Sequence, residues 1–289
     1  MHSARHFTLL FAALFALAPF AAAQNFDAVE ITATPLGGNV HLLQGQGGNM
    51  AVSIGGDGAL LVDDQFGPLA DKTKAKIAEL GGGAPAFILN THWHGDHTGG
   101  NEFFADAGTI IAHDNVRLRL ADAARLPDAL PVITYAEGIS VHYNGEEIRL
   151  IHLPAGHTDG DSAVWFTGSK VIHLGDEFVN NGFPFIDIQS GGTLVGFLAN
   201  ARRVLELVPD DILLIPGHGT VSSKAQFGQW LADLTESVNL VQVKMSEGKD
   251  LPSIIAEGLP EKYASWGQGF INESAWITTI YNSASASPR

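Results

Sequence analysis

Short apolar runs separated by glycine turns dominate the chain from about Val29 to Val62. Gly-Gly or Gly-Asp-Gly lies between these runs, which is typical of a meander of strands. A helix is predicted over Leu69–Leu80, where three glycines end it, and a buried strand follows. The strands predicted in this half are Val40–Leu43, Ala51–Ile54, Ala59–Val62 and Ala86–Leu89.

A similar order of elements returns in the second half of the chain. Apolar residues recur at helical spacing over Thr193–Val208, so a helix in this segment is expected to cover one face of a sheet. A second amphipathic helix is expected to begin near Ser222 or Ser223 and to dock in the same way. The strands predicted here are Ile148–Leu153, Ala163–Phe166, Val171–Leu174 and Ile212–Ile215.

Residues 1–23 have the order of a secretory signal. Arg5 precedes an apolar run from Phe7 to Phe20, and three alanines follow, so we expect cleavage after Ala23. A membrane anchor is the alternative, but the run is shorter than the ~20 residues that span a bilayer. We therefore expect a secreted or periplasmic protein with no membrane contact after signal removal. Residues 24–289 are expected to form one domain, with a frayed tail over Ser283–Arg289.

Composition narrows the partners and the chemistry. The chain has 16 Lys and Arg against 31 Asp and Glu, a formal charge of −15, so a small-molecule substrate is favoured over nucleic acid. Cysteine is absent from the sequence, which excludes disulfides, thiolate ligands and cysteine nucleophiles. Any metal ion must therefore be held by His, Asp or Glu.

The loop after the fourth predicted strand contains the most specific pattern in the chain. His92, His94, Asp96 and His97 offer four ligand side chains within six residues. Imidazoles packed together without partners would leave ring nitrogens unsatisfied, so this cluster is a poor candidate for core filling. Alternate positions place His92 and His94 on one side of an extended backbone, and Gly95 allows the turn that brings the next two ligands to a neighbouring point. The loop therefore offers ligands to two adjacent metal ions.

Three further candidates follow predicted strands. His157, Asp176 and His218 each lie beside glycine, as expected in tight loops at strand ends. Each alone has an alternative interpretation, a residue that hydrogen-bonds its own turn. Together with the earlier loop they give five His and two Asp, a set of N and O donors that suits zinc and also accepts iron or manganese.

This ordered set of residues closely resembles the metallo-β-lactamase fold superfamily over nearly the whole mature chain. The resemblance implies an α/β fold, a four-layer αββα sandwich with the site at one edge. It also implies two zinc ions, with Asp176 as the carboxylate that bridges them or completes the second site. The remaining ligands divide into His92, His94 and His157 for the first ion and Asp96, His97 and His218 for the second.

Such a site predicts hydrolysis of a carbonyl substrate. Metal ions lower the pKa of bound water to about 7, which provides hydroxide as the nucleophile and polarises the carbonyl. Asp96 is then the candidate catalytic residue, because a carboxylate there can pass a proton to the leaving group. Asp63 is expected to orient a ligand imidazole, with strand capping as its alternative, and Asp64 is the second candidate. Asp161 either supports the His157 loop or caps a turn.

The substrate is less well defined by the sequence. Zinc β-lactamases with a cysteine ligand often have a lysine three residues after it, whereas this chain has Asp176 and Val179. It is more similar to dimetal hydrolases such as glyoxalase II and lactonases, so cyclic amides, lactones, esters and thioesters stay open, with β-lactam hydrolysis as a secondary activity. Gly45–Asn49 and Asn180–Phe185 are candidates for the lips of the cleft.

Two alternatives belong to other functional classes. An iron-dependent oxidoreductase of the same fold is one, although His94 contradicts the diiron type, and His97 and His218 contradict the type with a single iron. An exported zinc-binding module without turnover is the other, and the complete ligand set argues against it. The native substrate, the native metal and the oligomeric state are not defined by the sequence.

Overall fold

The computed structural model describes residues 25–286. The predicted signal peptide and its cleavage site lie outside these described residues and stay predictions. Among the helices of the described part, none is both long and apolar enough to cross a membrane.

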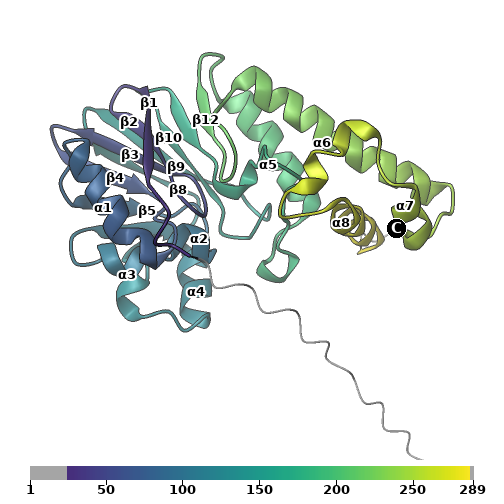
Figure 1. Cartoon of the computed structure of the whole chain (residues 1–289), viewed down its shortest axis with the longest axis horizontal. Coiled ribbons are helices and arrows are strands. Elements are labelled where there is room, and N and C mark those ends of the chain that lie inside the picture. The colour runs from purple at the N-terminus through teal and green to yellow at the C-terminus, as the bar shows by residue number, and fades with distance from the viewer. Residues whose placement is uncertain (1–24, 287–289) are drawn as a thin grey trace, which may run out of the picture.

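Two mixed sheets form the centre of the molecule (Figure 1). The first sheet contains seven strands in the order β1-β2-β3-β4-β5-β6-β7, and the second contains six in the order β13-β12-β11-β10-β9-β8. The first sheet consists of β1 Thr32–Gly37, β2 Val40–Gln44, β3 Met50–Gly55, β4 Gly58–Val62, β5 Pro85–Leu89, β6 Thr109–His113 and β7 Ile133–Tyr135. The second consists of β8 Gly138–Tyr143, β9 Glu146–His152, β10 Ser162–Phe166, β11 Val171–His173, β12 Leu213–Ile215 and β13 Ser222–Ser223.

Helices cover the outer face of each sheet. They are α1 Ala70–Glu79, α2 Gly95–Thr98, α3 Asn101–Phe104, α4 Asp114–Asp122, α5 Leu194–Leu207, α6 Lys224–Ser246, α7 Leu251–Glu257 and α8 Glu273–Ala286. Thr193 and Ser223 cap α5 and α6 through side-chain oxygens that accept backbone N–H bonds, as their positions in the sequence indicate.

The two halves share one plan of strand pairing. In each half, three antiparallel pairings lead to a parallel pairing, β4 with β5 and β11 with β12. The first sheet then adds two more parallel pairings, and the second adds an antiparallel one. A parallel pair needs a crossover connection, and α1 and α5 provide it. Each crossover helix therefore packs on the outer face of its own sheet.

The apolar residues form separate layers that define the architecture. Leu60 and Val62 belong to the cluster between the two sheets, whereas Ala59 and Leu61 belong to the cluster that Ile77 of α1 joins. Strand β4 is covered on both faces, which explains why its apolar run is continuous rather than alternating. On the far side, the second sheet packs against α5, α6 and α8. The predicted αββα sandwich is confirmed.

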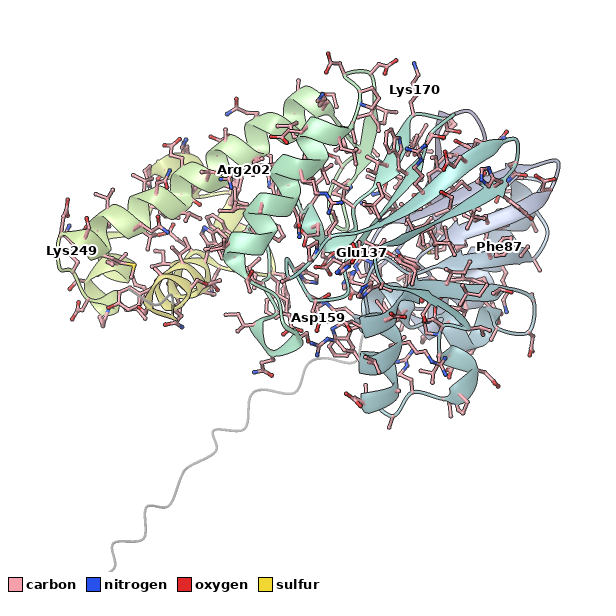
Figure 2. The ribbon with its side chains drawn as sticks, turned by 180° about the vertical axis from the view of Figure 1, so that it is seen from behind. Phe87, Glu137, Asp159, Lys170, Arg202 and Lys249 are labelled. Atoms are coloured by element: carbon pink, nitrogen blue, oxygen red, sulfur yellow. The ribbon has the colours of Figure 1, made fainter. Side chains whose placement is uncertain are left out.

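The carboxyl-terminal helices extend the molecule beyond the sandwich (Figure 1). Figure 2 shows Arg202 on the outer side of α5 and Lys249 at the end of this helical part farthest from the sheets. The expectation of a frayed tail from Ser283 is wrong for its first residues, because α8 continues through Ala286. The hydroxyl of Ser285 donates to the carbonyl of Tyr281 one turn earlier, so the polar side chains are accommodated by the helix itself.

Trp276 anchors α8 on the rest of the fold. It is fully buried, its indole N–H donates to Ser237 of α6 at 3.0 Å, and its ring stacks on Phe183 with centroids 5.5 Å apart. We expect Trp276→Ala to lower the free energy of unfolding by about 3–5 kcal/mol in urea titrations, because it leaves a cavity and removes the N–H that the Ser237 hydroxyl accepts. Val195→Ala on the exposed side of α5 is the control and is expected to change it by less than about 0.5 kcal/mol. Equal effects of both substitutions would contradict this role.

Candidate metal centre

The candidate ligands gather at one edge of the sandwich. Strands β5, β11 and β12 are followed directly by the segments that hold His92, Asp176 and His218. Their carboxyl ends meet at this edge because β5 and β12 each run parallel to a neighbour within their sheets. His157 comes from the loop between β9 and β10. Segments far apart in the sequence thus place their side chains in one volume.

The seven predicted ligands form two groups. In each group, one donor atom from every residue lies within 4.8 Å of those of the others. The first group is His92, His94, His157 and Asp176, and the second is Asp96, His97 and His218. Asp176 faces both groups, since its Oδ1 lies 3.1 Å from His97 Nε2 and its Oδ2 lies 3.7 Å from His157 Nε2. This is the position of a carboxylate shared between two cations.

In the first group, hydrogen bonds to the ring nitrogens that face away from the cleft fix the orientation of two imidazoles. His94 Nε2 donates to Asp187 Oδ2 at 3.0 Å, and His157 Nδ1 donates to the carbonyl of Phe185 at 2.7 Å. His94 Nδ1 and His157 Nε2 are then left 2.9 Å apart with their lone pairs facing each other. Two facing lone pairs repel unless a cation or proton lies between them, so the geometry fits a metal ion.

Asp63 organises the loop that holds the other buried ligands. One carboxylate oxygen accepts the backbone N–H of Thr91, and the other accepts the Thr91 hydroxyl and His97 Nδ1, both at 2.7 Å. Because the Thr91 proton points to Asp63, Thr91 Oγ1 accepts from His92 Nδ1 at 3.1 Å. Both rings therefore direct Nε2 inward. Asp63 itself has φ 56°, a left-handed conformation that Asp and Asn tolerate better than most residues.

Buried polar atoms without hydrogen-bond partners give an independent test of whether these residues fit metal ions. His92 Nε2, His97 Nε2 and Asp176 Oδ1 are buried and have no hydrogen-bond partner, apart from the 3.1 Å approach of His97 Nε2 to Asp176 Oδ1. Buried polar atoms without partners are costly, and these three belong to the two donor groups. All donors are N or O atoms of His and Asp, a set that divalent cations accept. The residues fit a pair of such ions.

The pKa values of the histidines shift in opposite directions in the two donor groups. Burial, together with the neighbouring imidazoles, lowers the pKa of His92 well below its usual value. Burial also opposes protonation of His218, but the carboxylates of Asp176 and Asp96 outweigh it and raise the pKa of His218 to about 9. The pKa of His97 is raised for the same reason. Without cations, the second group thus holds protons in their place.

Three neighbouring carboxyl groups support the loops from outside. Asp64 accepts the N–H of Gly100 at 2.8 Å, and burial raises its pKa well above its usual value, so it is not the partner of a ligand imidazole. Asp161 accepts the backbone N–H and the hydroxyl of Thr158, and thereby holds the turn that follows His157. Glu177 accepts the N–H of His157 itself at 2.8 Å.

Several residues of the site were not predicted. Asp187 contacts His94 across 93 positions of sequence, and its only sequence signal is the spacing to Ser190, which indicates a helix cap. His173 is buried, with Nε2 donating to the carbonyl of Asn49 at 2.9 Å. Trp93 packs against the small core that includes Val116 and Leu120 of α4, and its ring centroid lies 5.1 Å from that of His94.

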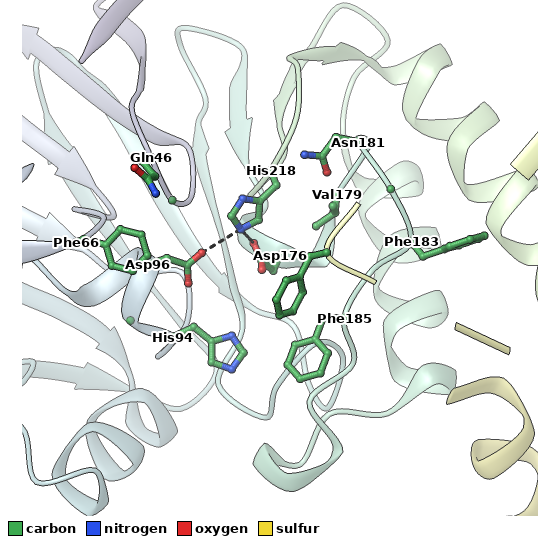
Figure 3. Close-up of a pocket in the computed structure, with 14 residues that line it drawn as sticks. Gln46, Phe66, His94, Asp96, Asp176, Val179, Asn181, Phe183, Phe185 and His218 are labelled. Carbon is green, nitrogen blue, oxygen red and sulfur yellow. Dashed lines mark ion pairs between the residues drawn. The ribbon is translucent and has the colours of Figure 1, made fainter. Parts of the chain in front are cut away.

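The two donor groups open into one cleft of about 570 Å³ (Figure 3). Both segments proposed as lips contribute to it, through Gln46 and Gly47 on one side and Asn181–Phe185 on the other. Gly48 packs directly over the imidazole of His97, where a Cβ atom would overlap the ring, so glycine is required there. The cleft gives a small molecule access to Asp96, Asp176 and His218.

Comparison with known sequences identifies the family. A sequence model of the metallo-beta-lactamase superfamily matches residues 33–218, more than half of the chain. The chain belongs to this superfamily, and the resemblance noted from its ligand residues is confirmed.

Among curated relatives, a hydroxyacylglutathione hydrolase from Rhodospirillum rubrum is 36% identical over 143 residues, which cover 49% of this chain and 51% of the relative. The alpha subunit of 2,4-dinitroanisole O-demethylase from Nocardioides sp. is 31% identical over 145 residues, 48% of this chain and 42% of that protein. The chain thus spans about half the length of these relatives.

Solved structures support the same fold. A metallo-beta-lactamase from Pontibacter korlensis superposes with a TM-score of 0.62 at 16% identity, covering 71% of this chain and 99% of that chain. DIM-1 metallo-beta-lactamase gives a TM-score of 0.63 at 20% identity, covering 72% and 99%. At such low identity the likeness concerns the fold.

Asp63 and Asp64 are adjacent in the sequence, so substitutions at the two positions give a matched test of the hydrogen bond between Asp63 and His97. We expect Asp63→Asn to weaken metal binding about 10–100-fold, because the amide no longer stabilises His97 as an N–H donor. Asp64→Asn is expected to leave affinity unchanged, since Asp64 accepts the N–H of Gly100 and hydrogen-bonds no ligand imidazole. Competition with a chromophoric chelator measures both affinities. Similar losses of metal affinity in the two variants would show that the effect comes from the loop both residues support and not from the hydrogen bond between Asp63 and His97.

The raised pKa values predict that metal uptake expels protons. His218, with a pKa of about 9, is charged at pH 7 in the metal-free protein, whereas a ligand imidazole must be neutral. We therefore expect about one to two protons released per chain at pH 7, and an apparent metal affinity that falls as the pH drops below about 9. Calorimetric titration in buffers of different ionisation enthalpy measures this release. Metal uptake without proton release would contradict the assignment of His218 as a metal ligand.

Proposed function

We propose that the protein is a binuclear zinc hydrolase that acts on a carbonyl-containing small molecule. The observation that carries the proposal is the shared position of Asp176 between two groups of His and Asp donors that open into one cleft. The outer hydrogen bonds hold His94, His97 and His157 with their free nitrogens directed inward. Such prior orientation lowers the cost of assembling a metal centre.

The donor set supports zinc as the metal. Imidazole and carboxylate ligands without thiolates suit Zn²⁺, with iron and manganese as its competitors. When bound, the two cations would supply a nucleophile from water at neutral pH and polarise the substrate carbonyl. His92, His94 and His157 would hold one cation, Asp96, His97 and His218 the other, and Asp176 both.

Asp96 has the position expected of a proton carrier. It lies in the first turn of α2 and lines the cleft, and its Oδ2 is 3.2 Å from His218 Nε2. About a quarter of its side chain is exposed, whereas that of His97 is fully buried. A carboxylate at the open side of the centre can accept a proton from the attacking water and deliver it to the leaving group. We assign this catalytic role to Asp96.

The relatives support hydrolytic chemistry. One relative is a hydroxyacylglutathione hydrolase, and another is the alpha subunit of a 2,4-dinitroanisole O-demethylase. We therefore propose esters, thioesters and lactones as the first substrates to test. β-Lactams belong in the same panel because the solved structures of similar fold are metallo-beta-lactamases.

A substrate panel tests the proposal. We expect about two zinc ions per chain, turnover of at least one carbonyl substrate, loss of activity with a chelator and recovery with zinc. Asp96→Asn, assayed at saturating zinc with its metal content measured, is expected to lower kcat about 10²–10⁴-fold. Asp71→Asn on α1 is the control, since Asp71 is exposed on the surface.

Each alternative has its own outcome. Near-normal turnover by a metal-replete Asp96 variant would rule out its catalytic role. Iron as the sole bound metal would favour an oxidoreductase, and a full complement of zinc without turnover would favour a binding module. These results separate the reaction class from the identity of the metal.

A further inference from the structure

Four phenylalanines line the cleft, and three of them, Phe66, Phe185 and Phe270, come from separate parts of the chain. Phe66 follows β4, Phe185 follows the loop that holds Asp176, and Phe270 precedes α8. Figure 3 shows Phe66 and Phe185 on opposite sides of the cleft, with His94 between them at its floor. Substrate in this cleft therefore lies against aromatic side chains.

One wall is continuous from the ligands to the solvent. The ring of Phe185 lies 5.9 Å from the His157 ring and 6.1 Å from the His94 ring, measured between centroids. On its other side, Phe270 meets it edge-on at 6.0 Å. Phe185 is 39% exposed and Phe270 is 90% exposed. Two neighbouring aromatic rings exposed beside a catalytic cleft mark a surface that a ligand can cover.

Phe270 is presented by a well-packed support. The backbone of Phe183 forms a bridge with Ile271, and its N–H donates to the carbonyl of Trp266 at 3.3 Å. The ring of Phe183 packs between Trp266 and Trp276, each 5.5 Å away. These contacts fix the segment before α8 against the cleft, so the exposure of Phe270 results from its placement by a buried aromatic cluster.

Charge is confined to the floor of the cleft. Among the described residues that line it, the ionisable ones are His94, Asp96, Asp176 and His218, all in the candidate metal centre, and none is Lys or Arg. The rim offers the neutral amides of Gln46 and Asn181. A substrate carboxylate held against these walls would give up its hydration without a cation to replace it.

We propose that the cleft selects uncharged carbonyl substrates with an apolar or aromatic group, and that Phe270 is a specificity-determining residue supplied by the carboxyl-terminal helical part. Residues 33–218 match the superfamily, so this wall is built partly by a segment outside the matched region. The proposal rests on the hydrolase function above, and it concerns which substrates the same site accepts.

Two esters with one leaving group test the charge preference. 4-Nitrophenyl pentanoate is neutral, and the 4-nitrophenyl monoester of glutaric acid has a carboxylate at a similar chain length. We expect the zinc-loaded enzyme to prefer the pentanoate by at least tenfold in kcat/KM. Asn181→Lys adds a cation at an exposed position of the rim and is expected to reduce this ratio at least fivefold. Equal turnover of both esters by the unmodified enzyme would overturn the proposal.

Phe270→Ala tests the aromatic wall with little risk to folding, because the side chain is mostly exposed. We expect KM for the pentanoate to rise at least fivefold with kcat and zinc content unchanged. Phe103→Ala is the matched control, since Phe103 is also an exposed phenylalanine but lines a neighbouring hollow rather than this cleft. Equal KM values for the two variants would overturn the role of Phe270.

A binding measurement separates this proposal from the hydrolase function. The neutral fluorophore N-phenyl-1-naphthylamine is expected to bind the zinc-loaded protein and the Phe103→Ala variant alike, and to bind Phe270→Ala at least fivefold more weakly. If the fluorophore behaves in this way but no ester is turned over, the apolar selectivity stands and the hydrolase function falls. Binding that is the same in all three proteins would overturn the selectivity.

Discussion

The site depends on four imidazoles being held with a chosen ring nitrogen directed inward. A buried imidazole has one donor and one acceptor nitrogen, and the partner of the outer nitrogen decides which faces the cavity. Asp63, Thr91, Asp187 and the carbonyl of Phe185 make this choice for His97, His92, His94 and His157, respectively. The resulting convergence of lone pairs on Asp176 creates a site that needs positive charge.

The architecture supplies these partners from both sheets. Asp63 follows β4 of the first sheet, whereas Asp187 and Phe185 belong to the connection between β11 and α5 of the second. His94 comes from the first half of the chain, yet its hydrogen-bond partner comes from the second. The metal centre can therefore form only when the two sheets are packed together, which links ligand geometry to the apolar layer between them.

The carboxyl-terminal helices have two structural roles. Trp276 and Tyr263 bury large aromatic surface and join the core on the outer face of the second sheet. The segment before α8 also reaches the cleft, where Phe270 extends the wall begun by Phe185. A segment that contributes no candidate ligand thus shapes the path by which a substrate approaches the metal centre.

The sequence alone determined the elements with strong periodicity and the residues with ligand chemistry. The cap at Ser223, the covered strand Ala59–Val62 and the seven candidate ligands all carry local signals, because capping, burial and donor type are properties of single residues and their neighbours. The ligand roles themselves stay predictions until metal is measured.

Only the tertiary structure decided which distant groups meet. Asp187 has the local pattern of a helix cap, and Phe270 is one exposed phenylalanine among several, so nothing near them in the sequence indicates a site. Their roles arise from packing of the two sheets and of α8, which brings together residues separated by tens of positions. Contacts of this kind depend on how the chain closes in space, and local sequence patterns do not record it.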